Sequence, residues 1–110
     1  MSPKVRLARL ADVKAVVVLE REIEGAPHWA ESDYAAMTDG GRVGLRRVLV
    51  VAEGDVSGEL VGFAVGKVIG PEDQGLGALE SVAVAASVRR TGVGRALCEA
   101  VVNWCVEQGA

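Results

Sequence analysis

The sequence predicts a mixed α/β (α+β) fold, a mostly antiparallel sheet flanked by helices in the order β-α-α-β-β-β-α. Three observations predict it: an alternating apolar segment near the start, three strand-like segments joined by short turn-rich linkers, and a final segment with helical periodicity. A length of 110 residues suits a single domain with a modest core, which we assign to residues 1–110.

The first third of the chain predicts a strand and two helices. Residues 5–10 read VRLARL, the alternation of a strand with one buried face, and Asp12 follows as a candidate N-cap. The segment VKAVVVLEREIEG is ambiguous, because its three successive valines favour a strand whereas LEREIE and Gly25 favour a helix with a C-cap. We interpret it as a helix. After a turn at Pro27, a short helix is expected over about residues 31–38.

Three strand signals follow, RVLVVAEG, ELVGFAVGKVIG and LGALESVAVA. The linker EGDVSGE predicts a hairpin between the first two, and GPEDQG joins the second to the third. From Val93 to about Gln108, apolar residues recur with the spacing of one buried helical face. A helix that follows a strand normally returns to deliver another strand, and none follows here. We therefore expect a fold that is cut short or completed by another chain.

Composition and charge exclude several classes of protein. The formal net charge is −3 and the basic residues form no broad stripe, which argues against a nucleic-acid binder. Charges interrupt every long apolar run, so we expect no signal peptide, no membrane span and a cytoplasmic location. Cys98 and Cys105 lie about 10 Å apart on one predicted helix, too far for a disulfide, and are expected to be reduced packing residues. His28 is the only histidine, so no metal site is expected.

The stretch RRTGVGRAL lies where the last strand signal gives way to the final helix. Amides in the first turn of a helix have no carbonyl partners and carry the positive end of its dipole, so they attract anions. Gly92 and Gly94 leave room for a phosphate, while Arg89, Arg90 and Arg95 add positive charge. This pattern predicts a diphosphate site. The alternative is that the glycines only ease packing and the arginines are solvated.

These residues carry a resemblance to a known family. SVAVAASVRRTGVGRAL resembles the acetyl-CoA signature of the GNAT N-acetyltransferase superfamily, an apolar strand followed by R/Q-x-x-G-x-G/A at a helix start. Arg89, Gly92 and Gly94 match each defined position. VRLARLADV is similar to the family's first strand and helix entry, and GALESVAV and PHWAESDY are similar to its ribosomal-protein-alanine N-acetyltransferase branch.

The resemblance implies a GNAT-like acyl-CoA N-acyltransferase fold and a binding site for acetyl-CoA, its co-substrate, without a metal. It also implies a primary amine as acceptor, which in that branch is a protein N-terminal amine. Backbone groups of Val82, Ala83 and Val84 would bind the pantetheine arm. The diphosphate would rest on the loop made of Arg89, Arg90, Thr91, Gly92, Val93, Gly94 and Arg95.

Glu80 is the one acid inside an otherwise apolar strand signal, and on a regular strand it would share a face with Val82 and Val84. Acetyl transfer needs the acceptor ammonium to lose a proton, which a carboxylate can accept directly or through water. The resemblance implies this catalytic role for Glu80. The alternative is that Glu80 faces solvent or pairs with an arginine. Arg46 and Arg47 are expected to flank a strand in solvent.

The sequence also departs from the family. In the family, another strand, a helix and closing strands follow the segment that ends here in EQGA, and the usual tyrosine general acid lies among them. Tyr34 is the only tyrosine; His28, Trp29 and Tyr34 fall where the family shapes its acceptor pocket, although packing also explains the two aromatic residues.

Three functions therefore stay open. The chain is an N-acetyltransferase, a non-catalytic acyl-CoA-binding or interaction module, or a plain structural domain with a tight glycine turn. We further expect an open sheet edge around Val82, which favours a homodimer or aggregation.

Overall fold

A computed structural model of the chain describes residues 4–23, 29–38, 45–54, 59–70 and 75–110. The elements follow the predicted order, with two short 3₁₀ turns added. They are β1 (Lys4–Leu7), η1 (Leu10–Asp12), α1 (Val13–Glu22), α2 (Glu31–Met37), β2 (Leu45–Glu53), β3 (Leu60–Ile69), β4 (Leu76–Val84), η2 (Ala86–Val88) and α3 (Val93–Glu107).

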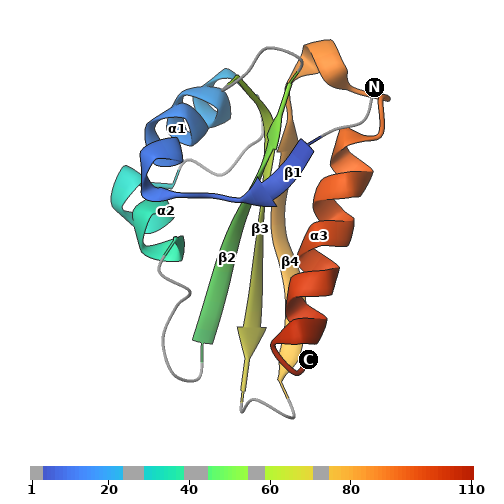
Figure 1. Ribbon diagram of the computed structural model, residues 1–110. Coiled ribbons are helices and arrows are strands. Elements are labelled where there is room, and N and C mark those ends of the chain that lie inside the picture. Colours follow the sequence, from blue (N-terminus) through green and yellow to red (C-terminus); the bar gives the residue numbers. More distant parts are fainter. Residues whose placement is uncertain (1–3, 24–28, 39–44, 55–58, 71–74) are drawn as a thin grey trace.

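The strands form one four-stranded antiparallel sheet in the order β1-β2-β3-β4, a meander that confirms the predicted antiparallel arrangement. Helix α3 lies along one face of the sheet, and α1 and α2 lie over the other (Figure 1). The predicted fold class is therefore confirmed. Strand β1 is shorter than the predicted segment and ends at Leu7, since the chain turns into η1 three residues later.

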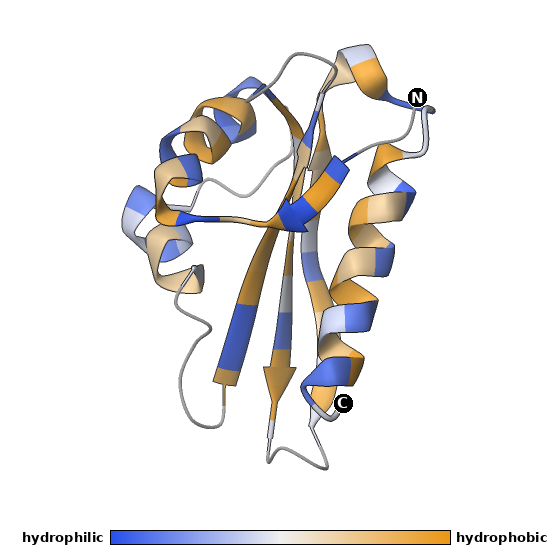
Figure 2. Cartoon of the chain, viewed as in Figure 1, coloured by the Kyte–Doolittle hydropathy of each residue, from blue (hydrophilic) through white to orange (hydrophobic). Residues whose placement is uncertain are grey.

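The face under α3 is packed closely because two glycines of β3 leave room for the helix. The side chains of Val93, Leu97 and Val101 are buried there against β2 and β3. A Cβ added at Gly66 would lie 2.3 Å from Val101 Cγ1, and one at Gly62 would lie 3.0 Å from Leu97 Cδ1. Only glycine allows so close an approach of the helix to the sheet. Orange, hydrophobic segments accordingly recur along α3 in Figure 2.

Helices α1 and α2 cover the opposite face, and its apolar core includes the buried carboxylate of Glu20. Tyr34 of α2 packs edge-on against Phe63 of β3, with ring centroids 5.8 Å apart. The Tyr34 hydroxyl donates a hydrogen bond to the carboxylate of Glu20, which is buried on α1. The ambiguous valine-rich segment is thus a helix, as predicted, and it ends at Glu22. The predicted turn at Pro27 and cap at Gly25 lie outside the described residues.

Asp12 occupies the N-cap position of α1, as predicted, but its side chain makes no capping hydrogen bond to the helix. The residue already has helical angles, φ −82° and ψ −17°, because η1 precedes the helix. Its carboxylate instead accepts hydrogen bonds from the Arg6 guanidinium at 2.8 and 3.0 Å and from the Arg9 amide at 2.7 Å. These contacts, and above all the hydrogen bonds from Arg6, lower the pKa of Asp12 to about 2. This ion pair ties β1 to the start of α1.

Both cysteines on α3 are free thiols, as their spacing predicted. Cys105 is buried and Cys98 is half-buried, so they pack against their surroundings rather than crosslink the chain. Burial raises the pKa of the Cys105 thiol.

None of the helices described is both long enough and apolar enough to cross a membrane.

Candidate functional site

The candidate site begins where β4 ends and the chain turns toward α3. The Ala85 amide donates to the Val61 carbonyl at 2.8 Å, which anchors the end of β4 to β3. The turn η2 follows, and the Thr91 hydroxyl donates back to the Val88 carbonyl. Short local hydrogen bonds therefore fix the path of the loop between the strand and the helix.

Gly92 is the N-cap of α3 and has φ +93°, a left-handed conformation that favours glycine. A Cβ at Gly92 would meet no atom within 4 Å, so the requirement is conformational rather than steric. Arg90 also lies in the left-handed region, with φ +67°. A non-glycine residue there is strained, and such strain is often found at functional sites.

Three amides at the start of α3 precede the helical hydrogen-bond ladder. The first bond of the ladder runs from the Ala96 amide to the Gly92 carbonyl at 3.0 Å. The amides of Val93, Gly94 and Arg95 thus have no partner within the helix and lie at the positive end of its dipole. A Cβ at Gly94 would lie 3.6 Å from Val84 Cγ2, an ordinary contact distance. This arrangement can hold an anionic group.

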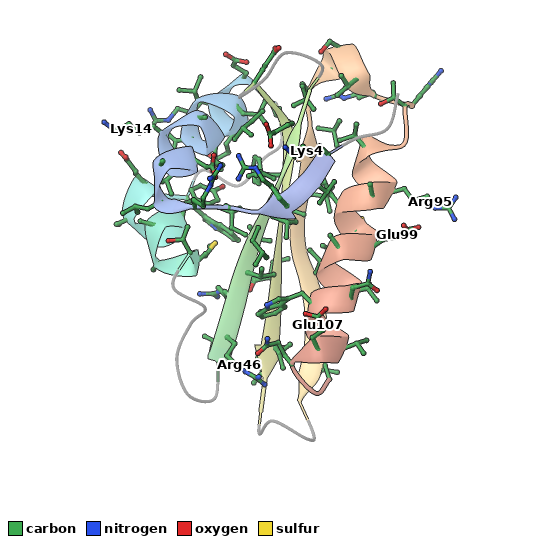
Figure 3. The ribbon with its side chains drawn as sticks, in the orientation of Figure 1. Lys4, Lys14, Arg46, Arg95, Glu99 and Glu107 are labelled. Carbon is green, nitrogen blue, oxygen red and sulfur yellow. The ribbon has the colours of Figure 1, made fainter. Side chains whose placement is uncertain are left out.

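The side chains of the loop differ in what they can add. Arg89, Arg90 and Thr91 are exposed, whereas Val93 is buried in the core, so Val93 can contribute only through its backbone. Arg95 projects away from the sheet beside Glu99 (Figure 3), and its Nε donates to Glu99 Oε1 at 3.1 Å. The charge of Arg95 is therefore partly offset by its neighbour.

Strand β4 has β3 on one side and no other strand on its outer edge among the described residues. Val82 and Val84 pair with Ala64 and Gly62, so both lie on the α3 face, while Ala83 lies on the opposite face and is buried. Val82 is 36% exposed. The backbone of the outer edge is free of a partner strand and can hydrogen-bond an extended ligand.

Glu80 sits at a β-bulge. Gly66 pairs with Leu79 and Val65 pairs with Ser81, so Glu80 is the extra residue opposite none. The bulge breaks the alternation along β4 and places Glu80 on the face opposite to Val82 and Val84. The prediction that the three share a face is therefore wrong. Sequence alternation alone could not reveal the inserted residue.

The carboxylate of Glu80 is ion-paired. Arg47 Nε donates to Glu80 Oε1 at 3.0 Å, and Lys67 Nζ lies 3.9 Å from the same oxygen. The Glu80 side chain is only 13% exposed. The alternative interpretation, that Glu80 pairs with an arginine, is confirmed in this geometry, while its catalytic role stays a prediction.

The expectation that Arg46 and Arg47 flank a strand in solvent is wrong, because β2 begins at Leu45 and includes both. Arg47 bonds Glu80 on one face of the sheet. Arg46 lies on the α3 face, where its Nη1 donates to Gln108 Oε1 at 2.8 Å; Figure 3 shows Arg46 near the C-terminal end of the chain.

The aromatic residues considered for an acceptor pocket pack in the core. Trp29 and Tyr34 lie with ring centroids 5.7 Å apart, and Tyr34 is fully buried. Burial first, and then the hydrogen bond with Glu20, raises the pKa of Tyr34 well above its usual value. His28 lies outside the described residues. The burial of Glu20 was not predicted from the sequence, although its helical spacing from Val16 places it on the buried face of α1.

Among the described residues, no three His, Cys, Asp or Glu side chains lie close enough to hold a metal ion.

The sequence profile of the Acetyltransferase (GNAT) family matches residues 15–110. The chain belongs to the GNAT family of acetyltransferases. No curated protein matches the sequence. The family match covers the loop at α3, the bulged strand β4 and most of the core described above. Enzymes of the GNAT fold use acetyl-CoA.

Solved GNAT structures share this fold. AAC(6')-Iy in complex with a bisubstrate analog has a TM-score of 0.78 at 21% identity, over 100% of this chain and 76% of its own. Rv2747 from Mycobacterium tuberculosis, in complex with CoA and NLQ, has a TM-score of 0.75 at 24% identity, over 97% and 60%. The ribosomal-protein-S18-alanine N-acetyltransferase from Escherichia coli has a TM-score of 0.64 at 20% identity, and the match covers 98% of this chain and 62% of that protein. These likenesses establish the fold.

Proposed function

We propose that this GNAT chain, as one partial domain over residues 1–110, takes part in acetyl transfer from acetyl-CoA to a primary amine. The acceptor we favour is a protein N-terminal amine. One observation carries the proposal: amides at the start of α3 have no partner within the helix, and the turn η2 and a short loop join them to a strand whose outer edge has no partner among the described residues. A ligand with a diphosphate and an extended polar arm can use both features.

Each part of the site would have a separate task. The amides of Val93, Gly94 and Arg95 would hold the diphosphate, with positive charge from Arg89 and Arg90. The outer-edge backbone of Val82, Ala83 and Val84 would hydrogen-bond the pantetheine arm, and Gly92 and Thr91 would fix the loop. Acetyl-CoA supplies the activated acyl group as a thioester. We propose a cytoplasmic location for this reaction.

Glu80 would accept a proton from the acceptor ammonium, directly or through a water molecule. The place of Glu80 supports this role. Glu80 lies two residues from Val82 along β4, on the side away from the diphosphate loop, where the thioester end of the proposed pantetheine arm would lie. Arg47 would hold the carboxylate in one orientation, since its Nε donates to one of the two carboxylate oxygens. Neutral amine is needed before the nucleophilic attack, so proton removal would set the pH dependence.

The test is acetyl transfer to an N-terminal peptide amine, with wild type compared with Glu80→Gln. If Glu80 accepts the proton, the variant loses about 10²-fold in kcat/KM and its pH profile flattens, while acetyl-CoA binding is kept. Gln keeps the shape and can still accept a hydrogen bond from Arg47. An unchanged pH profile in Glu80→Gln would show that Glu80 serves only as an ion-pair partner.

A second candidate is the non-catalytic acyl-CoA-binding module. Two observations favour it: Glu80 is held by Arg47, and Tyr34 is buried beside Glu20. Binding of acetyl-CoA without any acetyl transfer would support this candidate and contradict the enzyme.

We also propose that, in the absence of acetyl-CoA, the outer edge of β4 pairs with a second copy of the chain, in competition with the pantetheine arm. Leu76, Leu79 and Val82 are exposed along this strand, and an apolar open edge tends to find a partner strand. Sedimentation should then give a dimer. A compact monomer at high concentration would refute the pairing.

A further inference from the structure

A cluster of three charged side chains lies on the sheet face opposite α3. Arg47 of β2 and Lys67 of β3 are direct cross-strand partners, and Glu80 of β4 completes the cluster (Arg47–Lys67–Glu80). Gly66 and its partner Val48 point toward α3, so the neighbouring Arg47 and Lys67 point to the other face.

The cluster begins where the apolar core under α1 and α2 ends. Leu49 and Val65 are buried in that core, and Arg47 and Lys67 each lie two residues further along the same face. In Figure 2, hydrophilic segments interrupt β2 and β3 below the region that α1 and α2 cover. Arg47 is 40% exposed and Lys67 is 30% exposed. Their charged groups can therefore reach a ligand on this face.

The charges of the cluster do not balance. Two cations face one carboxylate, so a net charge of +1 remains by subtraction. Like charges placed directly across two strands repel each other, and a single carboxylate offsets this only in part. Among the described residues, Arg47 donates only through Nε, which leaves the outer edge of its guanidinium for another acceptor.

We propose that Arg47 and Lys67 form an anion-binding subsite that selects amine acceptors with a carboxylate a few bonds from the amine. This inference rests on the proposed function. Glu80 lies at the bulge, where it would meet the acceptor ammonium, and the two cations beside it would hold the acceptor carboxylate. Guanidinium and ammonium groups both form charge-assisted hydrogen bonds with carboxylates.

Two kinds of acceptor carry this chemistry. In a peptide, the carboxylate belongs to an acidic side chain next to the N-terminal residue. In a free amino acid, it is the α-carboxylate. Matched pairs separate the two sources: a peptide beginning Ala-Asp against one beginning Ala-Asn, and alanine against alaninamide. Within each pair, only the charge near the amine changes.

The experiment measures equilibrium binding of each probe to the protein saturated with CoA, which carries no acetyl group to transfer, and separately measures kcat/KM for acetyl transfer from acetyl-CoA. We expect the carboxylate member of at least one pair to bind about tenfold more tightly, and Arg47→Gln/Lys67→Gln to abolish that preference. Lys67→Gln alone should reduce it, which covers the case in which the double variant fails to fold. Acetyl-CoA affinity should not change in either variant.

Arg46→Gln is the matched control. It removes the same charge from the neighbouring position of β2 but on the α3 face, so it should keep the preference. Equal binding within both pairs by wild type, or a preference that survives in the double variant, overturns the subsite. Because binding is measured without turnover, the subsite is tested even if no acceptor is acetylated. Absence of acetyl transfer with the preference intact would instead contradict the proposed enzyme.

Discussion

The two faces of the sheet are built on different principles. Under α3 the face is apolar from Val93 to Cys105, with Arg46 only at the C-terminal end of the helix, and glycines of β3 bring helix and sheet into close contact. On the opposite face, the part under α1 and α2 is apolar but contains the Glu20–Tyr34 pair, and Arg47, Lys67 and Glu80 lie beyond the end of this core. One face is packed for rigidity, whereas the other retains polar groups.

This difference separates two tasks. A helix fixed against the sheet keeps its first-turn amides in one place relative to β4, which the proposed cofactor site needs. The opposite face keeps charged groups partly exposed, which suits recognition of a polar acceptor. The variants below test the two faces in order of expected effect.

The largest effect is expected from Leu97→Ala on the α3 face. Leu97 is 0% exposed, so truncation leaves a cavity between helix and sheet and should lower the free energy of unfolding by about 3 kcal/mol. Urea denaturation measures it. Val102→Ala on the exposed side of the same helix should cost less than about 0.5 kcal/mol. Equal losses in the two variants would mean that the face is not closely packed.

Tyr34→Phe tests the polar pair on the other face. It takes a donor from the buried Glu20 carboxylate and should cost about 2 kcal/mol. The raised pKa of Tyr34 also predicts an alkaline effect, because above pH ~10 the unfolded chain releases the phenolic proton while the folded chain keeps it. Wild type should lose more stability than the variant as pH rises above ~10, because the raised pKa of Cys105 leaves a smaller decline that both proteins share. Denaturation curves measured across this pH range give the free energy of unfolding of both proteins. Equal losses of stability in wild type and Tyr34→Phe would contradict the proposed effect of the Glu20–Tyr34 hydrogen bond.

Asp12→Asn tests the Arg6–Asp12 ion pair that ties β1 to α1 and should lower the free energy of unfolding by about 1 kcal/mol near neutral pH. The pKa of Asp12 is lowered in the folded state to about 2, so its contribution is present above pH ~4 and is lost as pH falls toward about 2. Acid unfolding curves should show this loss of stability in wild type and a smaller loss in the variant. Identical losses would show that the Arg6 pair contributes nothing to folding.

The smallest effect is a gain. Arg90→Gly should stabilise the fold by about 0.5 kcal/mol, because glycine adopts φ +67° without the strain that arginine incurs. This figure is the relief of strain after the entropy cost of the more flexible glycine in the unfolded chain is subtracted. Thermal unfolding measures the change. Arg90→Ala removes the same charge but keeps the strain, so it should give no gain. A gain in both variants would assign the effect to charge.

Periodicity and turn residues sufficed to predict the element order, the meander and the boundaries of α3. They also located the glycine loop, because the positive φ of Gly92 is a local property that favours glycine. The bulge at Glu80 was not predictable, since an inserted residue leaves no mark on apolar alternation and depends on pairing with β3. Partners such as Arg47 for Glu80 are 33 positions apart in sequence, and only the sheet register brings them together.

The central claim, that the first-turn amides of α3 bind the diphosphate of acetyl-CoA, is tested most directly by titrating three proteins with acetyl-CoA. A Cβ at Gly94 makes only an ordinary contact, 3.6 Å from Val84, so Gly94→Ala and Gly94→Asp should both fold. An aspartate in the first helical turn adds a negative charge beside the amides, and it should weaken binding at least about tenfold. Wild type and Gly94→Ala should bind alike. Equal affinity of Gly94→Asp, or no binding by wild type, would contradict the claim.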